Sequence, residues 1–281
     1  MNIIDSHVHV EAYSWRNLQE MAMNGVKAVV ACTVCPWRAG VDMVTQEVLI
    51  KRLLKHEVWR AKENNIELFV AIGVVAVAVP TDVEKFFGGM KEYLKAPSVV
   101  AIGEIGFDPR SQTCRDMGKQ REIFAFQLKL AKELDMPVIV HTPPDLRKAE
   151  ITVEEKYDKL KILQETIALV HEIGVKPNRV VLDHLEDEEW IKVALDNGFY
   201  GGITVQPWRG LGPEKAAQIV KALGPERLML NSDSSTLPSD HLAVPEVVFH
   251  LRKAKVPEES IRSIAFNNAV DFYGLAFQER G

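Results

Sequence analysis

Acidic and imidazole side chains open the chain at a spacing that suits a metal site. Asp5, His7 and His9 alternate within the first ten residues, behind the apolar pair at 3–4. In an extended strand the side chains at i and i+2 point to the same side, so the two imidazoles project together with the carboxylate in line. Nitrogen and oxygen donors grouped in this way bind divalent cations. A polar strand end is the alternative interpretation of this stretch on its own.

Further ligand-type side chains stand at the ends of other apolar runs. Four runs close with a histidine or a carboxylate, namely Glu104, His141, His184 and Asp233. Taken singly, each could be a turn carboxylate, a helix cap or a satisfied polar group at a strand end. The other histidines fall in helical or loop patterns, and His241, on the loop after the last run, is the reserve ligand. Together with the first pair, the set supplies four imidazoles and two carboxylates.

This donor set predicts a binuclear centre. Two divalent cations a few ångströms apart need a bridging carboxylate, for which Glu104 is the candidate. Water placed between two such cations becomes acidic enough to supply hydroxide at neutral pH. We expect Asp233 to hold one cation and to accept the proton of that water as a general base. Mixed nitrogen and oxygen ligands suit zinc, manganese or iron better than calcium. The expected cofactor is two zinc ions, with magnesium or manganese as alternatives.

The elements that must position these residues follow from the hydrophobic pattern. Eight apolar runs suit parallel strands covered on both faces, and they lie at 2–5, 27–33, 66–74, 99–104, 137–141, 179–183, 198–205 and 227–231. Segments of helical period lie between and after them, at 46–65, 81–95, 119–135, 153–173, 187–197, 213–223 and 258–273. The alternation predicts an α/β fold, a (β/α)8 TIM barrel with an extra C-terminal helix, in one domain over 1–281. Catalytic groups of such barrels stand at the C-terminal ends of the strands, so the six candidates share one rim.

Local signals support the helical ranges. Thr81, with a glutamate three residues later, has the spacing of a capping box. Gly174 follows a helical stretch, where a left-handed residue is expected. Pro213 stands at a helix start, where its missing N–H costs little.

Composition excludes several classes of function. The net charge of −5 gives no general basic field for a nucleic-acid backbone, so no stable nucleic-acid complex is expected. Three cysteines in 281 residues argue against a disulfide scaffold and for the cytoplasm. Cys32 is expected to be a small buried residue, although Cys32 and Cys35 also have the spacing of a redox or zinc motif. Neither a signal peptide nor a run of 18 apolar residues is visible, so no membrane association is expected.

Motifs spread over nearly the whole chain resemble the TatD family of metal-dependent hydrolases, within the amidohydrolase superfamily. The stretch 5–9 looks like the family's D-x-H-x-H, and 103–108 is similar to its G-E-x-G-L-D with phenylalanine in place of leucine. The segments 127–141, 224–233 and 267–275 resemble the family's fifth-strand histidine region, eighth strand and closing helix. The resemblance implies one metal on His7, His9, Glu104 and Asp233 and a second on Glu104, His141 and His184.

Three departures from the family pattern concern the loops. The eighth-strand motif at 231–235 reads N-S-D-S-S and lacks the usual glutamate and proline. The turn at 142–144 reads T-P-P in place of a more polar turn that carries an arginine. The stretch 182–186 differs from the loop of bacterial nucleases that contains glycine and phenylalanine. The ligand set is therefore intact while the substrate-facing loops differ, which indicates a divergent branch.

Candidate substrate-binding residues lie on loops after the strands. They are Arg110, Arg209, Trp208, Gln206 and Trp37. Arginines there could hold phosphate oxygens, and tryptophans could stack on a base. Ordinary loop residues that cap the barrel are the alternative interpretation.

The sequence thus predicts a metal-dependent hydrolase of phosphodiester bonds, resembling a deoxyribonuclease or phosphodiesterase. A hydrolase of lactones or cyclic amides on the same metal centre is the first alternative, supported by the acidic charge balance and the altered turn. A non-catalytic barrel used for binding is the second. The expected binding partner is a small molecule or a nucleic-acid end. A homo-oligomer is also possible on the sequence alone.

Overall fold

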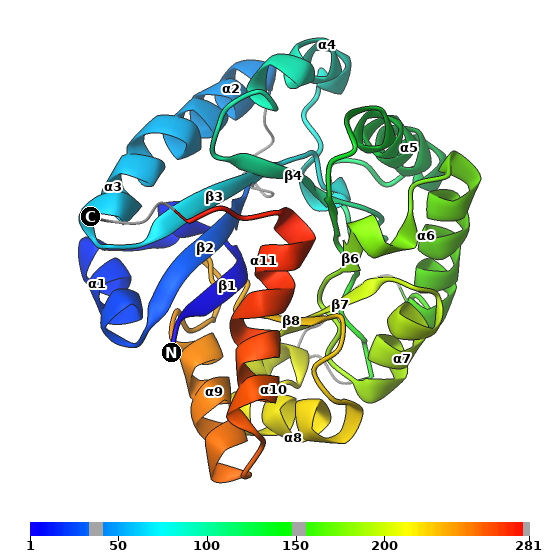
Figure 1. The fold of residues 1–281 in the computed structure, drawn as a ribbon. Coiled ribbons are helices and arrows are strands. Elements are labelled where there is room, and N and C mark those ends of the chain that lie inside the picture. Colours follow the sequence, from blue (N-terminus) through cyan, green and yellow to red (C-terminus); the bar gives the residue numbers. More distant parts are fainter. Residues whose placement is uncertain (34–41, 148–155, 278–281) are drawn as a thin grey trace.

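The strands form one sheet in the order of the sequence. The computed structural model describes residues 1–33, 42–147 and 156–277 (Figure 1). All neighbouring strand pairs are parallel, and the strands are β1 (Ile3–Val8), β2 (Val26–Cys32), β3 (Glu67–Ile72), β4 (Val99–Ile105), β5 (Val138–Val140), β6 (Val180–Leu182), β7 (Tyr200–Thr204) and β8 (Leu228–Asn231). A parallel bridge between Val8 and Ser234 brings the two edges together. The predicted (β/α)8 barrel is confirmed.

Helices surround the strands (Figure 1). The α-helices are α1 (Trp15–Met23), α2 (Met43–Lys51), α3 (Val58–Glu63), α4 (Val83–Tyr93), α5 (Met117–Leu134), α6 (Lys159–Ile173), α7 (Glu188–Asp196), α8 (Pro213–Leu223), α9 (Ala243–Lys253), α10 (Glu258–Arg262) and α11 (Asn268–Tyr273). Short 3-10 segments are η1 (Val10–Ala12), η3 (Ala76–Ala78), η4 (Pro177–Arg179) and η5 (Pro207–Arg209), and π-helical turns are η2 (Arg52–Glu57) and η6 (Ser263–Asn267). The predicted ranges omit α1 and α9, and the start of 153–173 lies outside the described residues.

Helix ends agree with the predicted signals except in one case. Gly174 caps α6 with φ +79°, and Pro213 is the first residue of α8. The capping box at Thr81 is wrong, because α4 begins after Asp82. The Asp82 carboxylate accepts the N–H of Met43, 2.8 Å away, and so joins α4 to α2 instead of capping its own helix.

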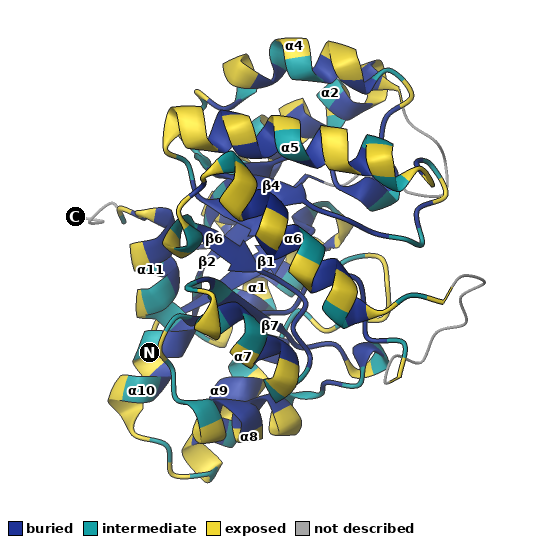
Figure 2. Cartoon of the chain, turned by 90° about the vertical axis from the view of Figure 1, so that its right-hand side faces the viewer, coloured by how far each residue is buried: buried dark blue, intermediate teal, exposed yellow. Residues whose placement is uncertain are grey.

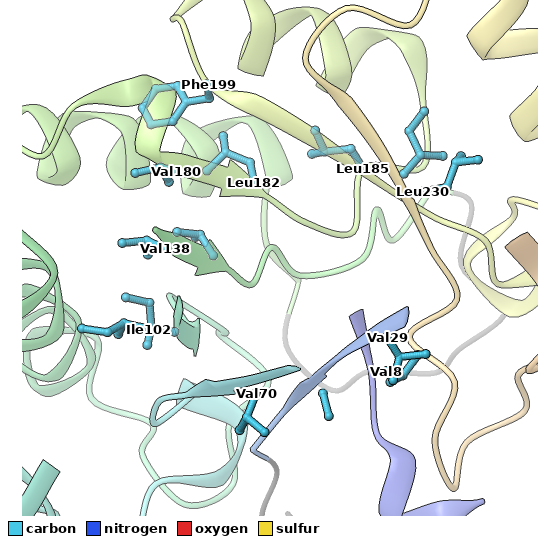
Figure 3. Close-up of a cluster of buried hydrophobic side chains, with 14 of the residues drawn as sticks. Val8, Val29, Val70, Ile102, Val138, Val180, Leu182, Leu185, Phe199 and Leu230 are labelled. Carbon is cyan, nitrogen blue, oxygen red and sulfur yellow. The ribbon is translucent and has the colours of Figure 1, made fainter. Parts of the chain in front are cut away.

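Two sets of buried apolar side chains alternate along the strands. One set extends from neighbouring strands toward the helices, as Figure 3 shows for Val29, Val70, Ile102 and Val138. The other set takes the intervening positions and contains Ile4, Ala28, Val30, Ala71, Ala101, Ile139, Val181 and Met229. Because successive side chains of a strand point to opposite faces, this second set fills the barrel. Figure 2 shows the strands buried and the helices exposed on their outer faces only.

The C-terminal segment closes one end of the barrel. Helices α10 and α11 with the π-helical turn between them confirm the predicted extra helix at 258–273. Phe272 and Tyr273 of α11 belong to the same cluster as the side chains that fill the barrel, and Figure 1 shows α11 lying across this end. The Tyr273 hydroxyl donates to the carbonyl oxygen of Ser6, 3.2 Å away. The opposite end is left for the site.

Two expectations from composition concern the cysteines and the membrane. Cys32 is fully buried and free, as expected, and burial raises the pKa of its thiol to about 11. The C-x-x-C alternative needs Cys35, which lies outside the described residues. None of the helices within the described ranges is both long and apolar enough to cross a bilayer.

Candidate metal centre

The structure brings all six predicted ligand residues together at the C-terminal ends of the strands. Each of them is buried, and the most exposed is Asp233 at 7%. Two groups of three have donor atoms within 4.8 Å of one another: His7 with His9 and Glu104, and Glu104 with His141 and His184. Glu104 belongs to both groups, which is the arrangement expected of a bridging carboxylate. Asp233 adjoins the first group, with its Oδ1 3.2 Å from Nε2 of His9.

Strand β1 and its continuation orient the first two imidazoles. Nδ1 of His7 lies 2.8 Å from Oδ2 of Asp183, and Nδ1 of His9 lies 3.2 Å from the carbonyl oxygen of Cys32. Both partners are acceptors, so each Nδ1 carries a proton and each Nε2 is the nitrogen left for a metal ion. Nε2 of His7 is buried and has no hydrogen-bond partner.

Strands β5 and β6 orient the other two imidazoles in the same manner. Nε2 of His141 lies 2.8 Å from Oδ2 of Asp108, and Nδ1 of His184 lies 3.0 Å from the hydroxyl oxygen of Thr204. The Thr204 hydroxyl donates to Oδ1 of Asn231, so it accepts from His184. The nitrogens that remain, Nδ1 of His141 and Nε2 of His184, lie 2.7 and 2.6 Å from Oε1 of Glu104.

This proton arrangement fits bound cations. The four nitrogens that face the two carboxylates are each available to a metal ion, while the other nitrogen of every imidazole, the outer one, donates to a fixed acceptor. Lone pairs and carboxylate oxygens cannot approach to hydrogen-bond distance unless a proton or a cation lies between them. Outer partners of this kind accompany histidine ligands in metal sites generally. The unpartnered Nε2 of His7 is the clearest sign that the donor set suits a metal ion.

Electrostatics lead to the same conclusion. Burial opposes the ionisation of Glu104, yet the imidazoles of His141 and His7 hold its pKa well below the usual value. Burial likewise opposes the charged form of His7, yet its interactions with Cys32 and then Glu104 hold its pKa well above the usual value. Burial, reinforced by the charge of Arg209, lowers the pKa of His184 to about 3, so this imidazole is neutral. The buried carboxylates are therefore stabilised by positive charge. Metal ions supply this charge when they displace protons from the ligands.

Two carboxylates that orient ligands did not stand out in the sequence. Asp108 accepts a hydrogen bond from His141, 33 positions away in the sequence. Asp183 accepts one from His7, 176 positions away. The position of the Asp183 side chain requires glycine at 202, because a Cβ on Gly202 would lie 1.6 Å from Oδ1 of Asp183. A carboxylate next to a strand-end histidine was the available signal for Asp183. The D of the 103–108 motif was the signal for Asp108.

Asp5 has a role at the seam of the barrel. Its carboxylate accepts from the backbone N–H of Ser232 at 3.0 Å and from the Ser232 hydroxyl at 2.6 Å. Burial raises its pKa to about 7, against the effect of these hydrogen bonds. Asp5 thus joins β1 to the segment after β8 and stands outside the two groups of candidate ligands.

The candidate substrate residues differ in the partners that they already have. Arg110 forms a bidentate pair with Asp108, and the Gln206 amide donates to the backbone oxygen of Asp233 at 2.7 Å. Arg209 is 3% exposed, and its Nη1 has no partner. Its guanidinium carbon lies 4.7 Å from the centroid of the Trp208 ring.

Nη2 of Arg209 lies 3.8 Å from Oδ2 of Asp233, so this guanidinium borders the candidate metal centre. Of the four candidates that the structure describes, Arg209 thus has donor capacity to spare next to the candidate ligands. Trp37 lies outside the described residues. His241 pairs with Glu20 of α1, with Nε2 2.9 Å from Oε2, and is not part of either group of candidate ligands.

Comparisons with known proteins agree with this geometry. A family model described as TatD related DNase matches residues 4–274. A protein of Methanocaldococcus jannaschii, named as an uncharacterized metal-dependent hydrolase, is 32% identical over 276 residues, which are 97% of this chain and 100% of that protein. The crystal structure of a TatD-like protein from Archaeoglobus fulgidus matches with a TM-score of 0.74 at 25% identity, over 97% of this chain and 100% of the other.

A more distant likeness shows the fold alone. The β-aspartyl dipeptidase of Fervidobacterium islandicum matches with a TM-score of 0.64 at 14% identity, over 98% of this chain and 75% of that one.

Proposed function

Because this chain belongs to the TatD family of metal-dependent hydrolases, we propose that it hydrolyses phosphodiester bonds, at nucleic-acid ends, with two divalent cations bound by the six clustered residues. The observation that supports this most is Glu104, which the two groups of candidate ligands share. His7, His9 and Asp233 would hold one cation beside Glu104, and His141 and His184 would hold the other. Zinc is the proposed metal, since imidazole nitrogens outnumber carboxylates.

The proposed role of each residue follows from its contacts. Two cations bound there would acidify a water molecule and neutralise charge on the phosphate oxygens. Asp233 stands beside His9 and accepts the proton of the attacking water. Arg209 donates from its unpartnered Nη1 to a non-bridging phosphate oxygen. Trp208, stacked on that guanidinium, fixes the direction of the donor.

Release of nucleotides from single-stranded DNA tests the proposal directly. We expect protein loaded with zinc, manganese or magnesium to release nucleotides, and a chelator to stop the reaction until metal is restored. DNA labelled at one end, compared with circular single-stranded DNA, separates attack at ends from attack inside the strand. Metal-loaded protein that binds two cations per chain yet leaves both DNAs intact would exclude the proposed substrate.

Replacement of Arg209 by methionine should lower activity toward anionic substrates selectively. A hydrogen bond to a charged group contributes about 1.5–3 kcal/mol, so kcat/KM for bis(4-nitrophenyl) phosphate should fall roughly 10- to 150-fold. The rate with the neutral ester 4-nitrophenyl acetate should fall less, because that substrate presents no anionic oxygen to the guanidinium and only the contact of Arg209 with Asp233 is lost. Arg147→Met is the matched control, because Arg147 also stacks on a tryptophan, with its guanidinium carbon 5.0 Å from the Trp190 ring centroid, but is exposed. Equal losses on both substrates in Arg209→Met, at full metal content, would refute the assigned role.

Hydrolysis of a lactone or cyclic amide is the second candidate. The neutralisation of Arg110 by Asp108 favours it, because this pairing leaves one cation fewer for a phosphate. There one metal ion would polarise the carbonyl group. Turnover of neutral esters or lactones above that of the phosphate diester in the same metal-loaded protein would make it the working function.

A further inference from the structure

A buried lysine lies directly behind one half of the metal centre. Lys159 is the first residue of α6 and is 3% exposed. Its position is unfavourable twice over, since lysine is rarely buried and the N-terminus of a helix repels positive charge. Its ammonium group pairs with Glu186, which is fully buried, and donates to the carbonyl oxygen of His184 at 2.8 Å.

The backbone of His184 depends on side chains for its conformation. His184 has φ +62°, in the left-handed region that a residue other than glycine rarely adopts. Its N–H donates to the hydroxyl oxygen of Thr204 at 3.1 Å. Its carbonyl oxygen accepts from Lys159, and the carbonyl oxygen of the preceding residue, Asp183, accepts from the hydroxyl of Thr142 at 2.6 Å. This conformation directs Nε2 toward Glu104, so the direction of the ligand depends on these side-chain donors and acceptors.

We propose that Lys159 is a positioning residue for the half of the metal centre formed by Glu104, His141 and His184. The ammonium group holds the His184 peptide in the orientation that presents the imidazole to the metal. The inference rests on the proposed metal centre and extends it to a residue outside the ligand set.

Glu186 makes this arrangement possible in a buried place. It neutralises Lys159, and its Oε1 accepts the backbone N–H of Asp145 at 2.5 Å. The pair therefore joins the start of α6, the segment after β5 and the residues after His184. Removal of the lysine alone leaves a buried carboxylate without its cation, which is costly in itself. A test must separate that general loss of stability from the loss of positioning.

The other half of the centre has a comparable support, which supplies a matched comparison. Arg60 is paired with Glu57, and both are buried. The Arg60 guanidinium donates to the carbonyl oxygens of Val10 at 2.7 Å and Tyr13 at 2.6 Å. These carbonyls lie on the turn that follows His9, so Arg60 braces the first half as Lys159 braces the second.

Zinc affinity measured in two single-half backgrounds tests the proposal without reference to any substrate. His9→Ala keeps the Glu104, His141 and His184 half, and His184→Ala keeps the half with His7. Competition with a chromophoric chelator gives the zinc affinity of each variant. Lys159→Met should weaken zinc binding roughly 10- to 100-fold in the His9→Ala background, as loss of an orienting partner does. In the His184→Ala background it should change the affinity less than about threefold, and Arg60→Met should give the reverse pattern.

A double variant separates positioning from stability. Lys159→Met with Glu186→Gln removes the unpaired buried charge and keeps an oxygen for the Asp145 N–H. We expect it to recover thermal stability relative to Lys159→Met while zinc affinity in the His9→Ala background stays weak. Equal weakening in both backgrounds, no weakening in either, or recovery of affinity in the double variant would overturn the proposal. A wild-type protein that binds zinc but cleaves no DNA would instead refute the proposed function and leave this inference standing.

Discussion

Replacement of Glu104 by glutamine is expected to abolish hydrolysis and to lower metal content in both halves of the centre. Glu104 is the residue common to both groups of candidate ligands, and Oε1 lies within 2.7 Å of His141 and His184. An amide keeps the size of the side chain but removes the charge that two cations would share. The loss in kcat should exceed the roughly 10²- to 10⁴-fold that a general base contributes, because the nucleophile is no longer generated.

Metal analysis together with steady-state kinetics checks this expectation. Glu20→Gln is the matched control, because Glu20 stands outside the ligand set and pairs with His241. It should keep both metals and full activity. Circular dichroism should show an intact barrel in both variants. Wild-type turnover in Glu104→Gln would remove this residue from the site, and with it the bridged centre.

Asp233→Asn should lose far more in kcat than in metal affinity. The asparagine keeps an oxygen donor near Nε2 of His9 but cannot accept a proton from water. We expect kcat to fall about 10²- to 10⁴-fold, the range for loss of a general base. Zinc affinity should fall less, by roughly 10- to 100-fold at most, because the amide oxygen and the other ligands remain in place.

The local fold around Asp233 should survive this substitution. Its φ of +42° is compatible with asparagine, which tolerates the left-handed region. The backbone N–H donates to the carbonyl oxygen of His7 at 3.0 Å, and the backbone oxygen accepts from Gln206. Rates compared at full zinc occupancy isolate the proton transfer. Unchanged kcat under that condition would move the role of general base to another residue.

Most of the fold follows from the sequence because the strands are continuous apolar runs. The eight predicted runs and the observed strands overlap in every case, as in 227–231 and β8 (Leu228–Asn231). Helix α1 is absent from the prediction although its apolar side chains lie on one face, where Leu18 and Met21 are buried. The predicted cap at Thr81 is wrong because α4 begins after Asp82, whose carboxylate accepts from the N–H of Met43, 39 residues away. Local patterns do not contain such distant contacts.

The candidate ligands follow from the sequence for a related reason. A barrel gathers the ends of all its strands on one rim, so ligand-type residues at strand ends must meet. The partners that orient them do not follow. Asp183 reaches His7 from across the barrel, and the acceptor for His9 is a backbone oxygen of Cys32, which has no sequence signature. The sequence also cannot show that Arg110 is already neutralised by Asp108.

The closed end of the barrel bears on how the protein is made. The Tyr273 hydroxyl contacts the Ser6 carbonyl 267 positions earlier, and Asp5 meets Ser232 across 227 positions. A growing chain on the ribosome holds His7 and His9 long before it holds Asp233. Contacts of such sequence separation form late. The histidines of the nascent chain are therefore without their carboxylate partner at first, and we expect metal uptake, and with it hydrolysis, to begin only after Asp233 has been synthesised.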